Sequence, residues 1–212
     1  GEVHEVLEGT AGAREILTSN DLLIVRTEGN APALIAFDTT EFQEKWRHSA
    51  AQISSCQIAI AGNSVYYSGA QELVALGLRD GRTRWRVPTQ ARPRTLVAQD
   101  QAVLLLGNTL LEAFDPANGE QLWREKVLAR QGWEADDLFV IDGLVWTGTH
   151  QFFAEGQTGR KSEDALALGR DLLTGAVKRR VEAQALRSPE PHHLCYRIKA
   201  PYRILVMSHE GA

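Results

Sequence analysis

Two adjacent histidines and a cysteine near the end of the chain have the clearest metal-ligand chemistry. His192 and His193 are followed by Cys195, and imidazole and thiolate groups both bind Zn²⁺ or a redox-active metal. Neighbouring side chains on a strand point to opposite faces, so both histidines could bind one ion only from a loop, which Pro189 and Pro191 favour. Because no second Cys or His group follows at a standard spacing, we favour packing and hydrogen bonding as the role of this cluster.

The other residues that could do chemistry form weaker patterns. Cys56 and Cys195 could form a disulfide in an oxidising compartment, or each could be a separate buried cysteine, and the sequence supplies no distance that decides between them. The acidic pairs at 136–137 and 163–164 could bind Ca²⁺, although we favour solvated loop charge. The sequence contains no Gly-x-Ser-x-Gly and no phosphate-binding loop that ends in Gly-Lys-Ser/Thr. We therefore name no catalytic residue.

The elements that must position these residues come from a block that occurs three times. Three alanines anchor the block at intervals of 39 and 38 residues: Ala36, Ala75 and Ala113. Three tryptophans keep the same intervals: Trp46, Trp85 and Trp123. A period near 40 residues built from short strands predicts a β-propeller, in which each repeat is one four-stranded blade.

Residues 94–127 show how one repeat builds a blade. A short apolar run at 96–98 is followed by a continuously apolar run at 103–106, as expected for a strand buried on both faces. The third strand, 111–114, ends at a turn that contains Asp, Pro, Asn and Gly. The fourth strand, 122–127, alternates apolar and polar residues, which is typical of an outer strand.

The repeat predicts an all-β chain: residues 1–212 form one segment of a β-propeller of four-stranded antiparallel blades. We expect a partial ring of about four blades with incomplete ends. The approximate blades are 11–50, 52–88, 94–127 and 138–185, with an incomplete unit at 192–212. Since common propellers have six to eight blades, we expect the sequence to be part of a longer one, so that a signal peptide could precede it.

The fourth unit is stretched. It has Ala167 as its anchor and Val177 near the tryptophan position. Its extra length lies in two polar, Gly-containing stretches, 129–137 and 150–164, which we expect to be loops on the rim or face of a blade.

Composition excludes some classes of function. The formal charge is −4 and 43% of the residues are hydrophobic, which is typical of a protein that buries a core. Nucleic-acid binding is not expected, because such proteins usually carry a basic stripe. We expect the arginines of two short segments to lie scattered at strand ends in solvent: Arg92, Arg94, Arg179 and Arg180. No apolar run reaches the roughly 20 residues that span a bilayer.

The three blocks resemble the A-x-D-x-x-x-G-x-x-x-W repeat of PQQ-like (quinoprotein-type) β-propellers, at 36–46, 75–85 and 113–123. The first block has Phe42 where the family has Gly, and the second has Gly77 in place of Asp. The tail at 192–200 is similar to a segment of large, uncharacterised bacterial members of the class. The resemblance implies the fold and a place in the bacterial periplasm or cell envelope, without a signal peptide in this sequence. It implies no particular activity, because the repeat occurs in quinoprotein dehydrogenases and in envelope scaffold proteins.

Two hypotheses for function follow. We favour a binding or scaffold module, without catalysis, that presents loops to a protein partner in the envelope. The alternative is a domain of a quinoprotein-like or metal-dependent oxidoreductase, whose site would lie at the propeller axis near His192, His193 and Cys195. The adjacent cysteines usual in quinoprotein dehydrogenases are absent from the sequence. PQQ or a metal ion is therefore an alternative cofactor that we do not favour.

Overall fold

The structure is a computed structural model that describes residues 6–49, 53, 58–69, 71–127, 138–148, 165–182, 196–200 and 203–207. These residues form β-strands and their connections, without an α-helix among them. Sixteen of the strands form four antiparallel sheets of four strands each, which we number blades 1 to 4 in chain order. The expectation of an all-β propeller with four-stranded blades is confirmed. Over the described residues there is no helix long and apolar enough to cross a membrane.

Within each blade, strands that follow one another in the sequence also pair with one another. Blade 1 contains β1 (Ala13–Ser19), β2 (Leu22–Thr27), β3 (Ala33–Asp38) and β4 (Glu44–Ser49). Blade 2 contains β5 (Ala59–Ala61), β6 (Ser64–Ser68), β7 (Glu72–Gly77) and β8 (Thr83–Pro88). Blade 3 contains β9 (Pro93–Ala98), β10 (Val103–Gly107), β11 (Leu110–Phe114) and β12 (Gln121–Lys126). Blade 4 contains β13 (Leu138–Ile141), β14 (Leu144–Gly148), β15 (Ala165–Asp171) and β16 (Val177–Glu182).

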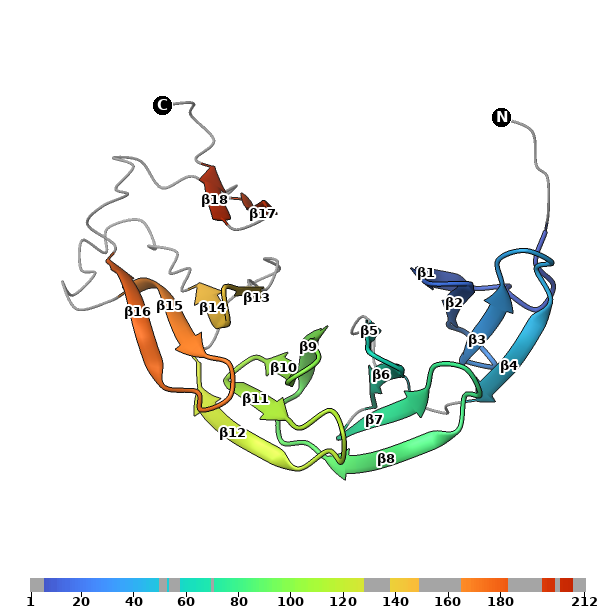
Figure 1. The fold of residues 1–212 in the computed structure, drawn as a ribbon, viewed down its shortest axis with the longest axis horizontal. Helices are drawn as coiled ribbons and strands as arrows, with labels where there is room; N and C mark the ends of the chain where they lie inside the picture. Colours follow the sequence, from blue (N-terminus) through green and yellow to red (C-terminus); the bar gives the residue numbers. More distant parts are fainter. Residues whose placement is uncertain are drawn as a thin grey trace.

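The blades follow one another along an open arc (Figure 1). The first strand of each blade lies on the concave side, and the fourth strands, β4, β8, β12 and β16, form the convex outer rim. A separate hairpin follows blade 4 and contains β17 (Tyr196–Ala200) and β18 (Arg203–Met207). The four blades therefore form part of a ring.

The hydrophobic core lies between blades. Blades 1 and 2 enclose a cluster around Ile24, Val74 and Leu76, all fully buried. Blades 2 and 3 enclose a cluster that includes Tyr66 and Leu105, and blades 3 and 4 enclose a third one. Every residue of β6 and β10 is buried, because these second strands contact a neighbouring blade on each face, and this explains the continuous apolar run at 103–106 in β10.

The three tryptophans join consecutive blades. Each indole Nε1 donates a hydrogen bond to a backbone carbonyl in the outer turn of the next blade: Trp46 to Leu78 (2.9 Å), Trp85 to Pro116 (2.9 Å) and Trp123 to Leu172 (2.8 Å). A glycine of that same turn lies against each ring, in the order Gly81, Gly119 and Gly175, where a Cβ would come within 2.6 to 2.9 Å of the indole. Within its own blade, each tryptophan is paired with a fully buried alanine: Ala36, Ala75 and Ala113. The residues that define the sequence repeat are therefore the ones that form the contacts between blades.

The outer turns are held by aspartates. Asp38 accepts backbone hydrogen bonds from Thr40 and Glu41, and these bonds hold the pKa of its carboxyl below the usual range. Blade 2 has Gly77 at this position, and there the carboxylate of Asp80 occupies the space that a side chain on Gly77 would take. Asp80 accepts a hydrogen bond from the backbone of Arg82, so that the turn keeps a carboxylate despite the substitution.

In blade 4, the strand pairing differs from the alignment of the repeat that the sequence suggested. In blade 3, Ala113 pairs with Trp123, and a bulge follows before Phe114. In blade 4, the corresponding bulge lies between Gly169 and Arg170, and Gly169 pairs with Arg179. Gly169 and Arg179 therefore take the anchor and tryptophan positions, and the sequence assignment of Ala167 and Val177 to them was wrong by two residues.

Trp146 on β14 explains the small residue at position 169. Trp146 and Gly169 are paired across β14 and β15, and a Cβ on Gly169 would lie 3.0 Å from the indole ring. An alanine at this position would press against that ring, and the tryptophan of blade 4 thus lies on the second strand, two strands nearer the axis than in the other blades.

Candidate functional site

The residues that the sequence suggested for metal binding lie outside the described part of the chain. This holds for His192, His193 and Cys195, for Cys56, and for the expected loops at 129–137 and 150–164. Among the residues that the structure describes, no three His, Cys, Asp or Glu side chains come together as a metal site would require. The structure instead shows a pocket between two blades.

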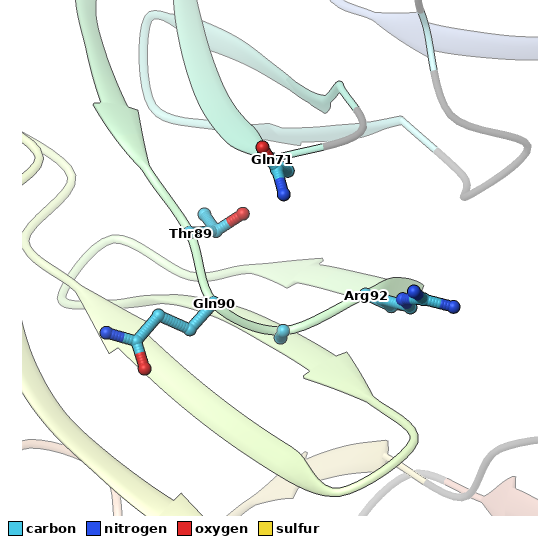
Figure 2. A pocket seen from close by; sticks show the side chains of 5 residues that line it. Gln71, Thr89, Gln90 and Arg92 are labelled. Carbon is cyan, nitrogen blue, oxygen red and sulfur yellow. The ribbon is translucent and has the colours of Figure 1, made fainter.

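The pocket lies where the chain passes from blade 2 to blade 3. It has a volume of about 630 Å³ and is lined by Gln71, which precedes β7, and by the linker residues between β8 and β9: Thr89, Gln90, Ala91 and Arg92. We call it the blade 2–3 pocket. Figure 2 shows the side chain of Gln71 and the hydroxyl of Thr89 facing one another, while the side chain of Gln90 points away. The side chain of Arg92 lies further along the linker.

A buried carboxylate holds the linker in place. Glu112 on β11 is 1% exposed, and its carboxylate accepts hydrogen bonds from the backbone N–H groups of Gln90 (3.1 Å) and Ala91 (2.9 Å). The side-chain amide of Gln121 donates a third hydrogen bond at 3.0 Å. A buried carboxylate is stable only when hydrogen-bonded in this way, so blade 3 both accepts the linker and fixes its path.

Two further contacts restrict the linker. The backbone N–H of Thr89 donates to the carbonyl of Gln71 at 3.0 Å, which links the two sides of the pocket. Gly107 on β10 lies close beneath, where a Cβ would come within 2.5 Å of the carbonyl oxygen of Arg92 and 3.0 Å of the Ala91 methyl. Only glycine allows this approach, so the pocket wall is built from fixed backbone.

Two polar groups near the pocket are unsatisfied. Thr89 is 8% exposed, and its Oγ1 is buried without a hydrogen-bond partner. The Oγ of Ser68, at the end of β6, is also buried and has no hydrogen-bond partner. Ser68 pairs with Leu73, which pairs with Val87, so both hydroxyls lie at the same end of blade 2. Buried polar atoms are normally hydrogen-bonded, and an exception of this kind suits a site that is completed by a ligand or by water.

The charge of the pocket comes from Arg92. Its side chain is exposed and makes no ion pair with the described residues. The nearest acidic groups are otherwise engaged, since Glu112 accepts three hydrogen bonds beneath the linker and Glu72 pairs with Arg86 at 3.4 Å. Gln71, Thr89 and Arg92 can all donate hydrogen bonds, which suits an acceptor-rich ligand group.

A second polar pair joins blades 1 and 2. His48 Nε2 lies 3.0 Å from the hydroxyl of Tyr67, with ring centroids 5.7 Å apart. Burial, together with the nearby positive charge of Arg86, lowers the pKa of His48, and burial raises the pKa of Tyr67. This pair lies among the packed residues between the blades, so we assign it to blade packing.

Basic residues are concentrated on the outer rim. Strands β4, β8, β12 and β16 contain nine Lys and Arg but only three Asp and Glu, although the whole chain carries a charge of −4. Arg92 and Arg94 lie at the start of β9, as expected, whereas Arg179 and Arg180 lie in the middle of β16, so the expectation that these two lie at strand ends was wrong. Charged side chains on edge strands prevent pairing with other chains, which explains the pattern without a ligand.

No sequence motif identifies the blade 2–3 pocket. Gln71, Glu112 and the linker come from separate parts of the chain, and Arg92 was expected only to be a solvated charge. The one available signal was a glutamate, Glu112, in the otherwise apolar third strand of the repeat. A lone carboxylate in a buried strand predicts a specific partner, which here is the linker backbone.

Comparison with known proteins agrees with the geometry. The family model described as outer membrane protein assembly factor BamB matches residues 4–105. A protein of that name from Burkholderia pseudomallei (strain K96243) is 29% identical over 153 residues, which are 62% of this chain and 39% of the relative. The chain thus spans less than half the length of this relative.

Solved structures show the same fold. The crystal structure of BamB from Moraxella catarrhalis has a TM-score of 0.61 at 17% identity, over 85% of this chain and 50% of the other. Quinohemoprotein alcohol dehydrogenase from Comamonas testosteroni also has a TM-score of 0.61, at 13% identity, over 93% of this chain and 40% of the other. At these identities the likeness concerns the fold alone.

Proposed function

Because the chain is a PQQ-type β-propeller repeat protein, we propose that it is a binding module that serves as a scaffold for protein partners in the bacterial cell envelope. The observation that carries the proposal is the match of residues 4–105 to the assembly-factor family, together with a relative of the same description at 29% identity. We infer that the partners take part in assembling outer membrane proteins. We further propose that residues 1–212 act as a single propeller segment.

The construction of the blades supports this role. The middle strands of blades 2 and 3 are buried between neighbouring blades, and the outer turns of blades 2, 3 and 4 are each fixed by an indole from the preceding blade. The loops and linkers at the ends of the strands are thereby held on a rigid frame, which lowers the entropy that must be lost when a partner binds.

The test uses the full-length protein in its own bacterium. We expect deletion of its gene to lower the amount of folded β-barrel protein in the outer membrane, and the intact gene to restore it. Affinity isolation after crosslinking should recover outer-membrane assembly components with the tagged protein. Unchanged levels of folded outer-membrane proteins, with no such component recovered, would contradict the proposed function.

The oxidoreductase alternative rests on fold likeness alone, at 13% identity, and we do not propose it. The metal-site hypothesis for His192, His193 and Cys195 remains a sequence prediction. Metal analysis of the purified full-length protein tests it, with His193→Ala as the variant that should lose the metal. Stoichiometric metal in the parent and none in the variant would support the site.

A further inference from the structure

We propose that the blade 2–3 pocket binds a carboxylate side chain, Asp or Glu, from an acidic segment of a protein partner. The proposal rests on the proposed function and adds to it the place and the chemistry of recognition. Its basis is that three residues with side-chain hydrogen-bond donors, Gln71, Thr89 and Arg92, line one pocket of about 630 Å³.

The donors fit a carboxylate because that group only accepts hydrogen bonds. The guanidinium of Arg92 supplies a positive charge and paired N–H groups, which match the geometry of a carboxylate. The Thr89 hydroxyl and the Gln71 amide supply uncharged donors on the opposite wall, where Figure 2 shows them facing one another. A positively charged ligand is disfavoured, because Arg92 would repel it. Neither Glu112 nor Glu72 is free to pair with such a ligand, since both carboxylates already have partners.

The unpaired hydroxyl of Thr89 favours binding of a hydrogen-bond acceptor to the pocket. Its Oγ1 is buried and lacks a partner within the described structure. Because this atom is shielded from solvent and the Gln71 side chain faces it, a carboxylate oxygen would accept its hydrogen after displacing Gln71, and binding would satisfy a group that the free protein leaves unpaired. Ser68 Oγ, at the same end of blade 2, is a second donor within this region.

The pocket is also preorganised. The backbone of Gln90 and Ala91 is held by Glu112, the backbone of Thr89 is held by Gln71, and Gly107 supports the linker from below. Binding therefore requires ordering of the Gln71 and Arg92 side chains, while the linker is already in place.

The experiment is an NMR titration of the 212-residue chain with two capped peptides, acetyl-Gly-Glu-Gly-amide and acetyl-Gly-Gln-Gly-amide. We expect the glutamate peptide to shift the backbone amides of residues 71 and 89–92 in a saturable way, with the glutamine peptide at least tenfold weaker. Acetyl-Gly-Gly-Gly with a free carboxyl terminus tests whether a main-chain carboxylate is preferred. Equal binding of the Glu and Gln peptides, tighter binding of the free carboxyl terminus, or no shifts at these residues would overturn the proposal.

Matched variants test whether the glutamate peptide binds in the blade 2–3 pocket. Arg92→Gln and Thr89→Val should each weaken binding of the glutamate peptide several-fold, because the first removes the positive charge and the paired N–H groups and the second removes the hydroxyl with little change in volume. Arg124→Gln, on the outer rim, removes an exposed arginine of the same charge and should leave binding unchanged. Equal loss in Arg92→Gln and Arg124→Gln would show attraction to the overall charge, which would overturn the pocket as the site.

A second measurement separates the two proposals. In the full-length protein, Arg92→Gln should weaken the recovery of partners in the crosslinking experiment. If partner recovery and outer-membrane assembly are unchanged in Arg92→Gln while gene deletion abolishes both, the scaffold function stands and the pocket proposal fails.

Discussion

Gly175 in blade 4 lies against the indole ring of Trp123 in blade 3, and the same ring donates a hydrogen bond to Leu172 at 2.8 Å. One turn thus provides both a flat surface and an acceptor for a side chain of the preceding blade. The relation recurs between Trp46 and Gly81 and between Trp85 and Gly119. Neighbouring blades are therefore coupled in stability, and the coupling can be measured by substitution.

Gly119→Ala should destabilise the protein by about 2–4 kcal/mol. The residue has φ +78°, and a Cβ would lie 2.8 Å from the Trp85 ring and 2.9 Å from Val87, so both backbone strain and overpacking contribute. Gly62→Ala is the matched control, with φ +54° and its nearest contact at 3.9 Å, and should cost only about 1 kcal/mol. Urea denaturation measures both variants. Equal losses would show that the ring contact contributes nothing.

Trp123→Ala should cost roughly 3–5 kcal/mol, because it opens a cavity between blades 3 and 4. Trp123→Phe keeps an aromatic ring but leaves the carbonyl of Leu172 without its donor, so an intermediate loss of at least about 1 kcal/mol is expected. Thermal and urea unfolding followed by circular dichroism measure both. A Trp123→Ala variant as stable as the parent would mean that the residue is not part of the packing between blades.

Glu112→Ala should destabilise the chain by about 2–4 kcal/mol, since the N–H groups of Gln90 and Ala91 would lose their acceptor beneath the linker. Amide hydrogen exchange should quicken at Gln90 and Ala91 before it changes elsewhere in blade 3. Glu120→Ala, at an exposed position of the same blade, should change stability by less than about 0.5 kcal/mol. Unchanged exchange at the linker would contradict the anchoring role of Glu112.

His48 should make stability depend on pH between about pH 5 and 7. Burial and Arg86 lower its folded-state pKa below the usual value of 6.5, so the unfolded chain binds a proton more readily than the folded chain. The stabilisation is fully present above pH 6.5 and is lost as the pH falls through the folded-state pKa. We expect His48→Gln to flatten the stability profile in this window. An identical slope in the variant and the parent would rule out this titration as the cause.

Much of the fold was predictable from the sequence, because its signals are local. Alternating strands, apolar runs and Asp-to-Gly turns occur within single repeats, and the four-stranded blades follow from them. The register of blade 4 is present in the spacing of Gly169, Asp171, Gly175 and Arg179, but the alanine and tryptophan of the repeat are both replaced, and the assignment to Ala167 and Val177 was wrong. The reason for a glycine at position 169 was not predictable, because it lies in the contact with Trp146 on the adjacent strand.

The blade 2–3 pocket could not be predicted for a similar reason. In the sequence, Arg92 looks like one of many surface charges, and Thr89 looks like an ordinary polar residue that follows a strand. Only the folded arrangement shows that the Thr89 hydroxyl is buried without a partner and that Gln71 faces it. Glu112 was the exception, since a carboxylate in a buried strand requires donors wherever they come from.

The sequence by itself determined that this protein is a propeller of four-stranded blades, because strand alternation and turn chemistry act over a few residues and repeat along the chain. The tertiary structure decided which residues of the repeat meet. Within one repeat, Gly119 and Trp123 are four positions apart and look like partners, yet Gly119 contacts Trp85 and Trp123 contacts Gly175. The physical reason is that a blade has two apolar faces, so its buried side chains find their partners only in the neighbouring blades. The same rule places the pocket at a junction between blades, where no single repeat contains all of its residues.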